Sequence, residues 1–232
     1  QLAELLWAMD EVIEGERAHT LMLEKSKFIV LRNSIDVYSK GKKNQSLGNI
    51  GKWTSGGTPS KKIHKYWDNG TIPWITPKDM KSEYLSASID YLTDKSIQEN
   101  KAKIFKKGSI VLVWRSGILQ HTLPIARVER EFCVNQDLKV FEPKSKLFIE
   151  EFVRVFLKVN SEKIRRECVK EGTTVQSIDT NSFMKFEIPE ITLELQKKMI
   201  KEEIAFENAF ISAVNKCSCS QSLQKSLINQ IF

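Results

Sequence analysis

The sequence predicts an α+β fold, in which one mixed α/β domain is flanked by two long helices that pair as an antiparallel coiled coil. Apolar side chains recur three and four residues apart near both ends of the chain, which is the spacing of a helical seam. All six prolines and four of the five tryptophans lie between Gly51 and Pro189. Short β-branched runs bounded by turn residues fill the same segment. We therefore expect helical segments at residues 1–36 and 191–232 and a globular domain at residues 44–190.

The first helix is predicted over residues 2–33, because no proline precedes Pro59 and one stripe of side chains continues along it. Leu5 and Val12 widen the stripe, and Asn33, Ser34 and Asp36 are the expected terminators. The stripe itself consists of Leu2, Leu6, Met9, Ile13, Glu16, Thr20, Leu23, Lys27 and Val30.

The globular domain is predicted to contain five short strands that are bounded by turn residues. A short helix starting at Thr93 or Asp94 is expected to run toward Ile104. Residues 147–160 carry apolar side chains at helical spacing, so we predict an amphipathic helix that docks on the sheet. The predicted strands are residues 72–75, 89–92, 109–114, 123–128 and 138–141.

The last helix is predicted after Pro189, over residues 191–232, and has a second seam that is polar in its middle. Serine side chains compete for backbone hydrogen bonds, so the run from Cys217 to Ser222 is expected to fray or kink. The seam consists of Ile200, Glu203, Phe206, Phe210, Val214, Cys217, Gln221, Gln224, Ile228 and Ile231.

The charge balance is moderately basic, with 36 Lys and Arg against 29 Asp and Glu and a net charge of +7. Such an excess is compatible with an anionic partner. The basic residues cluster at 61–65, 101–107 and 158–170. No apolar run approaches the roughly 20 residues of a membrane span. The four cysteines form no C-x-x-C pair, and no secretory signal is evident, so we expect a cytoplasmic protein.

Signatures of enzymes are sparse. The sequence contains no Pro-Pro pair, no G-x-G turn, no phosphate-binding loop and no H-E-x-x-H motif. The sharpest catalytic signal is Asp137-Leu138-Lys139, which matches the acidic-x-Lys core of many metal-dependent nucleases. Glu142-Pro143-Lys144 matches it too. About three such triplets are expected by chance in this composition, so the residues favour a chain without catalysis and leave a Mg²⁺-dependent nuclease as an alternative.

Five motifs occur in an order that resembles one known family. They are GKWTSGGTPS at 51–60 with YW at 66–67 and IPWITPKDM at 72–80, GSIVLV at 108–113 with RSGI at 115–118, VNQ at 134–136, GTTVQSI at 172–178, and IPEITLELQ at 188–196. Together they resemble a target-recognition domain from the specificity subunit of type I restriction-modification systems. LAELLWAMDEVIE at 2–14 is similar to the start of the helix that joins two such domains.

The resemblance implies a half-subunit or fragment that reads one half of a bipartite target in double-stranded DNA. It also implies that the helices act as a spacer and dock methyltransferase (modification) subunits, with the restriction subunit as a further candidate partner. A homodimer of half-subunits is the alternative to one longer chain. No cofactor is expected on this chain, because S-adenosylmethionine would bind the methyltransferase partner. The competing class of function is a protein-interaction module that assembles partners without reading bases.

A DNA reader needs cations that hold phosphates and loop side chains that present donors and acceptors to base edges. We assign no catalytic or metal-binding residue. Asn135 and Gln136 could equally be a buried amide pair that satisfies backbone groups. Trp53, Trp67 and Trp74 are predicted to be core residues, and Gly56, Gly57 and Gly117 to serve backbone turns. The predicted DNA contacts are Ser55, Thr58, Ser60, Lys61, Lys62, Lys65, Lys78, Arg115, Ser116, Gln120, His121, Asn135, Gln136, Lys170, Thr173, Thr174 and Gln176.

Overall fold

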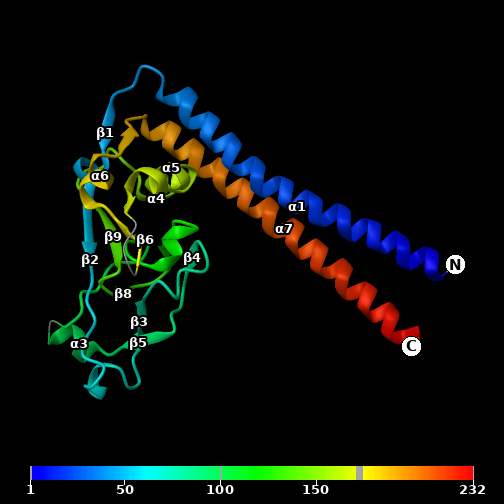
Figure 1. The fold of residues 1–232 in the computed structure, drawn as a ribbon, viewed down its shortest axis with the longest axis horizontal. Helices are drawn as coiled ribbons and strands as arrows, with labels where there is room; N and C mark the ends of the chain where they lie inside the picture. Colours follow the sequence, from blue (N-terminus) through cyan, green and yellow to red (C-terminus); the bar gives the residue numbers. More distant parts are fainter. Residues whose placement is uncertain (1, 100, 171–174, 232) are drawn as a thin grey trace. The chain divides into compact units, whose positions relative to one another are not determined.

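The computed structural model describes residues 2–99, 101–170 and 175–231 and has a mixed α/β fold with a long helix at each end (Figure 1). The chain divides into two compact units. One unit contains residues 1–37 and 198–232, and the other contains residues 38–197. The predicted α+β fold class, with long helices on both sides of one sheet-containing domain, is confirmed.

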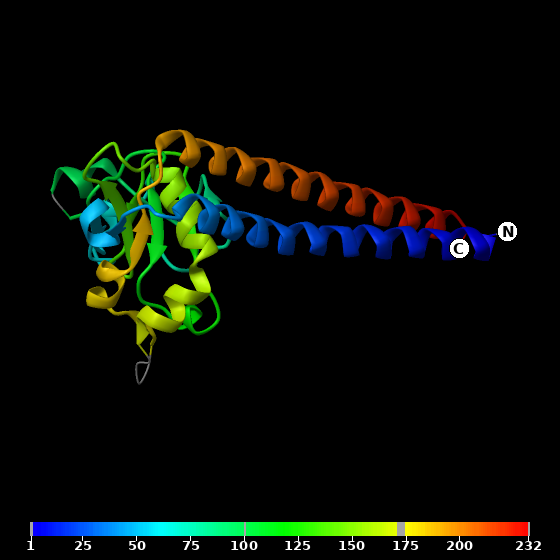
Figure 2. The ribbon, with the colours of Figure 1, turned by 90° about the horizontal axis from the view of Figure 1, so that it is seen from above.

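The first unit is a helix pair formed by α1 (Leu2–Ser39) and α7 (Leu193–Ile231). The two helices lie side by side and antiparallel in both views (Figures 1 and 2), and Gln224 Nε2 donates to Asp10 Oδ1 at 2.7 Å. The predicted end of α1 near Asp36 is wrong, because the helix continues to Ser39. One expected terminator, Ser34, donates its hydroxyl to Glu202 on α7 and so does not cap the backbone.

The predicted seam of α1 holds as far as Lys27 and then changes register by one position. Ile13 and Lys27 are buried, whereas Val30 is 40% exposed and Leu31, 1% exposed, takes its place. A straight helix has 3.6 residues per turn, so a pattern with a strict 3.5-residue period drifts around its surface. Leu5 and Val12 are exposed and do not belong to the seam.

The predicted seam of α7 drifts around the helix in the same way. Cys217 is buried as predicted, but Val214 and Ile228 are exposed. The expected fraying between Cys217 and Ser222 is wrong, because α7 continues through this run. Ser222 Oγ donates to the Ser218 carbonyl one turn earlier, so the serine hydroxyl bonds within the helix without ending it.

The second unit is organised around a five-stranded sheet with the order β2 (Gly51–Ser55), β9 (Leu138–Pro143), β6 (Ile110–Val113), β7 (Ile125–Val128) and β4 (Tyr84–Leu85). Neighbouring strands are antiparallel except β4 and β7, which are parallel. Every residue of β6 is fully buried, as its unbroken apolar run requires. Helix α4 (Glu150–Val159), predicted over 147–160, packs against β6 and β7.

A three-stranded sheet has the order β5 (Asp90–Leu92), β3 (Ile72–Ile75) and β8 (Cys133–Val134). Trp74, Leu92 and Cys133 form its core. Two short two-stranded ribbons complete the strands of the domain. They are β1 (Asn44–Ser46) with β12 (Glu187–Pro189), and β10 (Val169–Lys170) with β11 (Ser177–Ile178).

The remaining helices are short. They are α2 (Leu47–Ile50), the 3-10 turns η1 (His64–Tyr66) and η2 (Gly117–Gln120), α3 (Asp94–Gln98), α5 (Ser161–Cys168) and α6 (Thr180–Lys185). The predicted helix toward Ile104 is too long, because the Ser96 carbonyl accepts the amides of Lys101 and Ala102 and turns the chain away. All five predicted strands are confirmed with small shifts at their ends. No helix in the described part of the chain is both long and apolar enough to cross a membrane.

Candidate functional site

Four segments that are far apart in sequence meet where β6 ends. The amides of Trp114 and Arg115 both donate to the Asp137 carbonyl, on the connection from β8 to β9. On its other side, the Ser116 amide donates to the Gln176 carbonyl and Arg115 forms an isolated bridge with Ser177. The segment after β2 joins through Thr58. The structure thus brings together the predicted residues Thr58, Arg115, Ser116, Asn135, Gln136 and Gln176.

The central ion pair of this site joins Arg115 to Asp137. Arg115 Nε donates to Asp137 Oδ1 at 2.8 Å, and the arginine side chain is 57% exposed while the aspartate side chain is 21% exposed. Asn135 holds the other side of the carboxylate, because its Nδ2 donates to Asp137 Oδ2 at 3.0 Å and its Oδ1 accepts the Asp137 amide. Asn135 is buried, so its amide fills a scaffold position.

Gln136 lies differently from its neighbour. It is exposed, and its Oε1 accepts the Thr58 hydroxyl at 2.7 Å. Thr58 follows Gly56, where a β-carbon would lie 1.8 Å from the Val134 carbonyl oxygen. Only glycine allows the two backbones to approach so closely, so Gly56 brings the segment after β2 against β8. A β-carbon at Gly117 would meet nothing within 4 Å, and the backbone there shows no positive φ.

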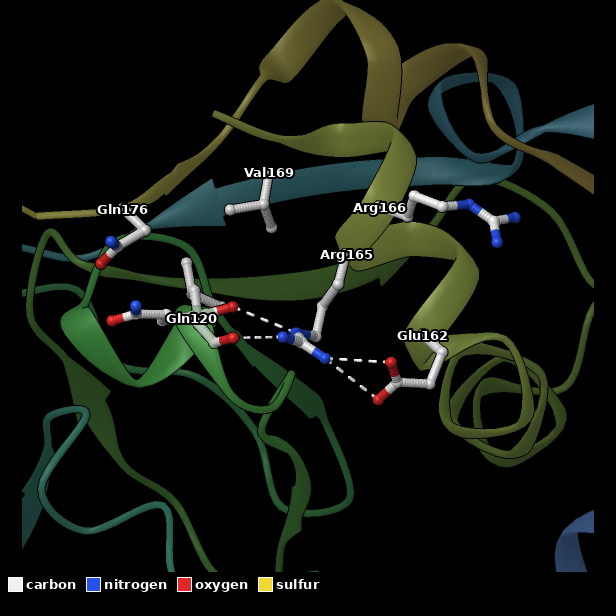
Figure 3. A pocket seen from close by; sticks show the side chains of 7 residues that line it. Gln120, Glu162, Arg165, Arg166, Val169 and Gln176 are labelled. Atoms are coloured by element: carbon white, nitrogen blue, oxygen red, sulfur yellow. Dashed lines mark hydrogen bonds and ion pairs between the residues drawn. The ribbon is translucent and has the colours of Figure 1, made fainter. Parts of the chain in front are cut away.

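A pocket of about 310 Å³ opens beside the turn η2 (Figure 3). Arg165 of α5 donates to the carbonyls of Leu119, at 3.1 Å, and Gln120, and it pairs with Glu162. Figure 3 shows the guanidinium between the Gln120 backbone and the Glu162 carboxylate. Gln120 and Gln176, both predicted DNA contacts, line this pocket with Arg166 and Val169. The arrangement fixes the turn and leaves polar side chains at the pocket wall.

Three of the five predicted lysines lie beside acidic partners. Lys61 pairs with Asp90 of β5 at 2.9 Å and lies over the rings of Trp67 and Trp74. Lys65 pairs with Glu99 at 2.8 Å, and this hydrogen bond raises the pKa of Lys65. Their positive charges are therefore partly neutralised within the domain.

Lys170 pairs with Asp179 at 2.6 Å. This hydrogen bond and those from Ser182 lower the pKa of Asp179 to about 2. Like the ion pairs of Lys61 and Lys65, the Lys170–Asp179 pair reduces the positive charge that is available to an anionic partner.

The other predicted residues differ in placement. Ser60, Lys62, Lys78 and His121 are exposed, and Ser55 is half-buried at the end of β2 opposite Lys139. Thr173 and Thr174 lie outside the described residues. Trp53 and Trp74 are buried and Trp67 is half-buried, as expected of core residues. Residue patterns missed Arg165 as an anchor, because its carbonyl partners lie about 45 positions away in sequence.

The two charged residues of the nuclease-like triplet, Asp137 and Lys139, hold parts of the scaffold. Asp137 is bound by Arg115 and Asn135. Lys139 Nζ lies 4.6 Å from the centroid of the Trp114 ring and donates to the Trp53 carbonyl, and burial lowers its pKa. Both side chains already have partners within the domain.

Residues 39–212 match the family model of the type I restriction modification DNA specificity domain. The chain belongs to this family. The match covers the globular domain and part of α7, and it includes the sheet, the Arg115 site and the pocket. This family consists of DNA specificity subunits, a non-catalytic class, and the nuclease alternative is set aside.

Specificity subunits from distant organisms are similar to this chain. The EcoR124I/EcoR124II specificity subunit of Escherichia coli is 31% identical over 202 residues, which are 86% of this chain and 50% of that protein. The MjaIX specificity subunit of Methanocaldococcus jannaschii is 30% identical over 158 residues, which are 67% of this chain and 35% of that protein. The chain thus spans half or less of these relatives.

A solved structure shares the fold. The HsdS subunit from Thermoanaerobacter tengcongensis superposes with a TM-score of 0.64 at 12% identity, over 99% of this chain and 56% of that chain.

Proposed function

We propose that this specificity-family chain reads one half of a bipartite double-stranded DNA target. The observation that carries the proposal is the convergence at the end of β6 of side chains that can contact bases. Arg115 and Gln136 are exposed and come from different segments, and each is held by a neighbour. Base reading needs polar side chains in fixed positions on a rigid scaffold, and the buried strand β6 supplies the scaffold.

Phosphate contacts supply the affinity in this proposal. Lys62 and Lys78 are exposed, and neither forms an ion pair or a side-chain hydrogen bond with a described residue. They are therefore better phosphate ligands than Lys61 or Lys65, whose acids would have to be displaced. DNA binding by the chain is expected to weaken steeply as salt rises, because phosphate contacts release counterions.

The helix pair is proposed to act as a spacer and to dock methyltransferase subunits, which would carry S-adenosylmethionine. Large apolar side chains support a docking role, since Trp7, Met22 and Ile29 are each at least 60% exposed. Exposed apolar groups of this size are typical of surfaces that bind another protein. The whole complex would work on DNA in the cytoplasm.

Co-expression with the cognate methyltransferase tests this function. Methylated adenines are then mapped across the genome, with the methyltransferase expressed alone as the control. A split motif that appears only with this chain supports the proposal, and a palindromic motif would indicate a homodimer of half-subunits. Methylation that does not depend on the chain would contradict it.

The rival function is an assembly module that reads no bases. It predicts that Arg115→Ala and Gln120→Ala leave the methylated motif unchanged. Base reading predicts that these changes relax or abolish the motif while the complex with the methyltransferase still forms. Co-purification of the complex provides the control for assembly.

A further inference from the structure

Arg115 is an exposed residue of the candidate site whose backbone is held on both sides. Its amide donates to the Asp137 carbonyl at 3.1 Å, and the preceding amide of Trp114 donates to the same oxygen at 2.8 Å. On the other side, Arg115 forms an antiparallel bridge with Ser177. Its backbone thus continues the β6 strand between two neighbouring segments, although the side chain is 57% exposed. The base of the side chain is fixed while its end reaches solvent.

The guanidinium is held at one nitrogen only. Nε donates to Asp137 Oδ1, whereas Nη1 and Nη2 have no hydrogen-bond partner among the described residues. The carboxylate cannot swing away, since Asn135 donates to its other oxygen. Asn135 is fixed in turn, because its backbone amide donates to the Ile75 carbonyl of β3. This chain of contacts fixes Nε and leaves the two terminal nitrogens of an exposed side chain available to a ligand.

We infer that Arg115 reads a guanine in the recognised half-site, with Asp137 and Asn135 as positioning residues. Guanine presents two acceptors, N7 and O6, on its major-groove edge, and they match the spacing of Nη1 and Nη2. A phosphate fits less well, because the adjacent Asp137 carboxylate cancels the arginine charge and repels an anion. The inference rests on the proposed function and adds the base and the positioning residues.

The test uses the whole complex of this chain with its methyltransferase, on duplexes that carry the mapped target. Each G·C pair of the half-site is replaced in turn by A·T, and affinity is measured for the wild type and for Arg115→Lys and Arg115→Ala. We expect one pair at which the wild type discriminates by about 5- to 150-fold. Both variants should lose that discrimination and no other, since lysine keeps the charge but lacks the fork.

The positioning role is tested with Asp137→Ala and Asn135→Ala. Each should reduce discrimination at the same base pair by about 3- to 10-fold, and neither should add to the effect of Arg115→Ala. Affinity for unrelated DNA should stay constant or rise, because a negative charge is lost in Asp137→Ala. Glu131→Ala, which removes an exposed carboxylate just before β8, is the matched control and should leave the discrimination at every base pair unchanged.

Three results would overturn the inference. They are the absence of an Arg115-dependent base pair, a dependence on an A·T pair, and an equal loss of affinity for all DNA in Asp137→Ala, which would indicate a purely structural role. In each case target-dependent binding by the wild type leaves the proposed function standing. If the wild-type complex binds all sequences equally, the proposed function fails as well.

Discussion

Asp179 illustrates how one carboxylate can hold two elements. It precedes α6, where its Oδ1 accepts the Ser182 amide at 2.9 Å, and its Oδ2 pairs with Lys170 of β10. Both interactions favour the ionised form, which is why the pKa falls to about 2 from an ordinary value of 3.8. A group with a lowered pKa stabilises the fold above its ordinary pKa, and that contribution is lost as pH falls through the lowered value.

This linkage predicts a pH window for Asp179→Asn. At pH 7 the variant should unfold at a lower urea concentration than the wild type, because the charge-assisted bonds are lost. The difference should shrink between about pH 4 and pH 2, where the wild-type carboxylate itself becomes protonated. Urea unfolding at several pH values measures it, and Glu167→Gln on neighbouring α5 is the control. An equal difference at pH 7 and pH 2 would contradict the prediction.

The four cysteines differ in burial and so in reactivity. Cys133, Cys168 and Cys217 are buried and Cys219 is exposed. Burial raises the pKa of Cys133 to about 12 and, together with nearby Glu167 and Asp179, that of Cys168 to about 11. Only a thiolate is the reactive nucleophile, so these two thiols are inert in the folded chain at neutral pH.

A thiol reagent at pH 7.5 should therefore label Cys219 first. We expect one label per chain under native conditions and four after denaturation, as counted by mass spectrometry. Cys219→Ser serves as the control and should remove the early label. Rapid native labelling of Cys133 would show that the core around β8 opens easily.

At the same scale, the sequence predicts residue types better than it predicts their partners. Loop position and hydrogen-bonding chemistry indicate Thr58, Arg115 and Gln136, which the structure gathers into one site. The same reasoning interprets Asp137 only through the nuclease-like triplet. Its true partner, Arg115, lies 22 positions earlier, and no local pattern relates the two residues.

Among the elements, η2 depends on a residue outside itself. This turn carries Gln120, and Arg165 of α5 binds the carbonyls of Leu119 and Gln120 at its end. Carbonyls at the end of a helical turn have no partner within the turn, so an arginine donor satisfies them. Arg165 thereby connects η2, which is proposed to contact DNA, to helix α5.

We predict that Arg165→Ala loosens η2 without unfolding the domain. Amide hydrogen exchange at Leu119, His121 and Thr122 should accelerate by about tenfold, because each amide bonds within the turn. Arg165→Lys should lie in between, since lysine can reach only part of the same set. Arg166→Ala is the matched control, because Arg166 is exposed and its one ion pair with a described residue is a 3.6 Å contact with Glu167. Equal exchange in both alanine variants would contradict the anchor role.

The helix pair contains a buried ion pair. Lys27 of α1 pairs with Glu203 at 3.2 Å and with Glu207 at 2.8 Å, and the side chains of Lys27 and Glu203 are at most 9% exposed. Removing one partner of a buried pair leaves an uncompensated charge. Such a pair also favours one register of two helices over others.

Lys27→Met should thus lower the free energy of unfolding by about 3 kcal/mol or more. Lys27→Met with Glu203→Leu should recover most of that loss while weakening the preference for one register. Arg17→Ala, which removes an exposed pair, should cost less than about 1 kcal/mol. Thermal unfolding measures all three. A single variant as stable as the wild type would show that the pair is not buried in solution.

Local patterns predict an element when the element is long or strongly apolar. β6 is detected because Ile110 to Val113 form one unbroken apolar run, and α4 because its apolar face repeats over ten residues. The strands of two or three residues, such as β1, β4 and β8, are too short to show a period. Their pairing depends on distant partners, since Asn44 of β1 lies opposite Pro189 of β12.

For the whole molecule, the distribution of paired and unpaired lysines predicts the response to salt. The chain has a net charge of +7, but Lys61, Lys65 and Lys170 already face acids. Each phosphate contact that a variant loses reduces the slope of log affinity against log salt by about 0.9. We predict that Lys62→Ala and Lys78→Ala each reduce the slope by about one contact, and that Lys61→Ala reduces it less.

Fluorescence titrations of the methyltransferase complex with target DNA, at several salt concentrations, measure these slopes. Lys146→Ala, at an exposed lysine on the turn before α4, is the control for a generic loss of one charge. Equal slopes for the wild type and the Lys62 and Lys78 variants would place the phosphate track elsewhere on the domain.

The pairing of β1 with β12 also governs how the chain folds as the ribosome makes it. Asn44 emerges 145 residues before its partner Pro189, a delay of about 7 to 30 seconds at common rates of synthesis. The part of α7 that covers Ser34 follows later still, with Glu202. During that interval the apolar seam of α1 lacks α7, with which it pairs in the folded structure. Translation thus exposes the apolar seam of α1 before it supplies α7. During this time a chaperone or a neighbouring nascent chain can bind the seam.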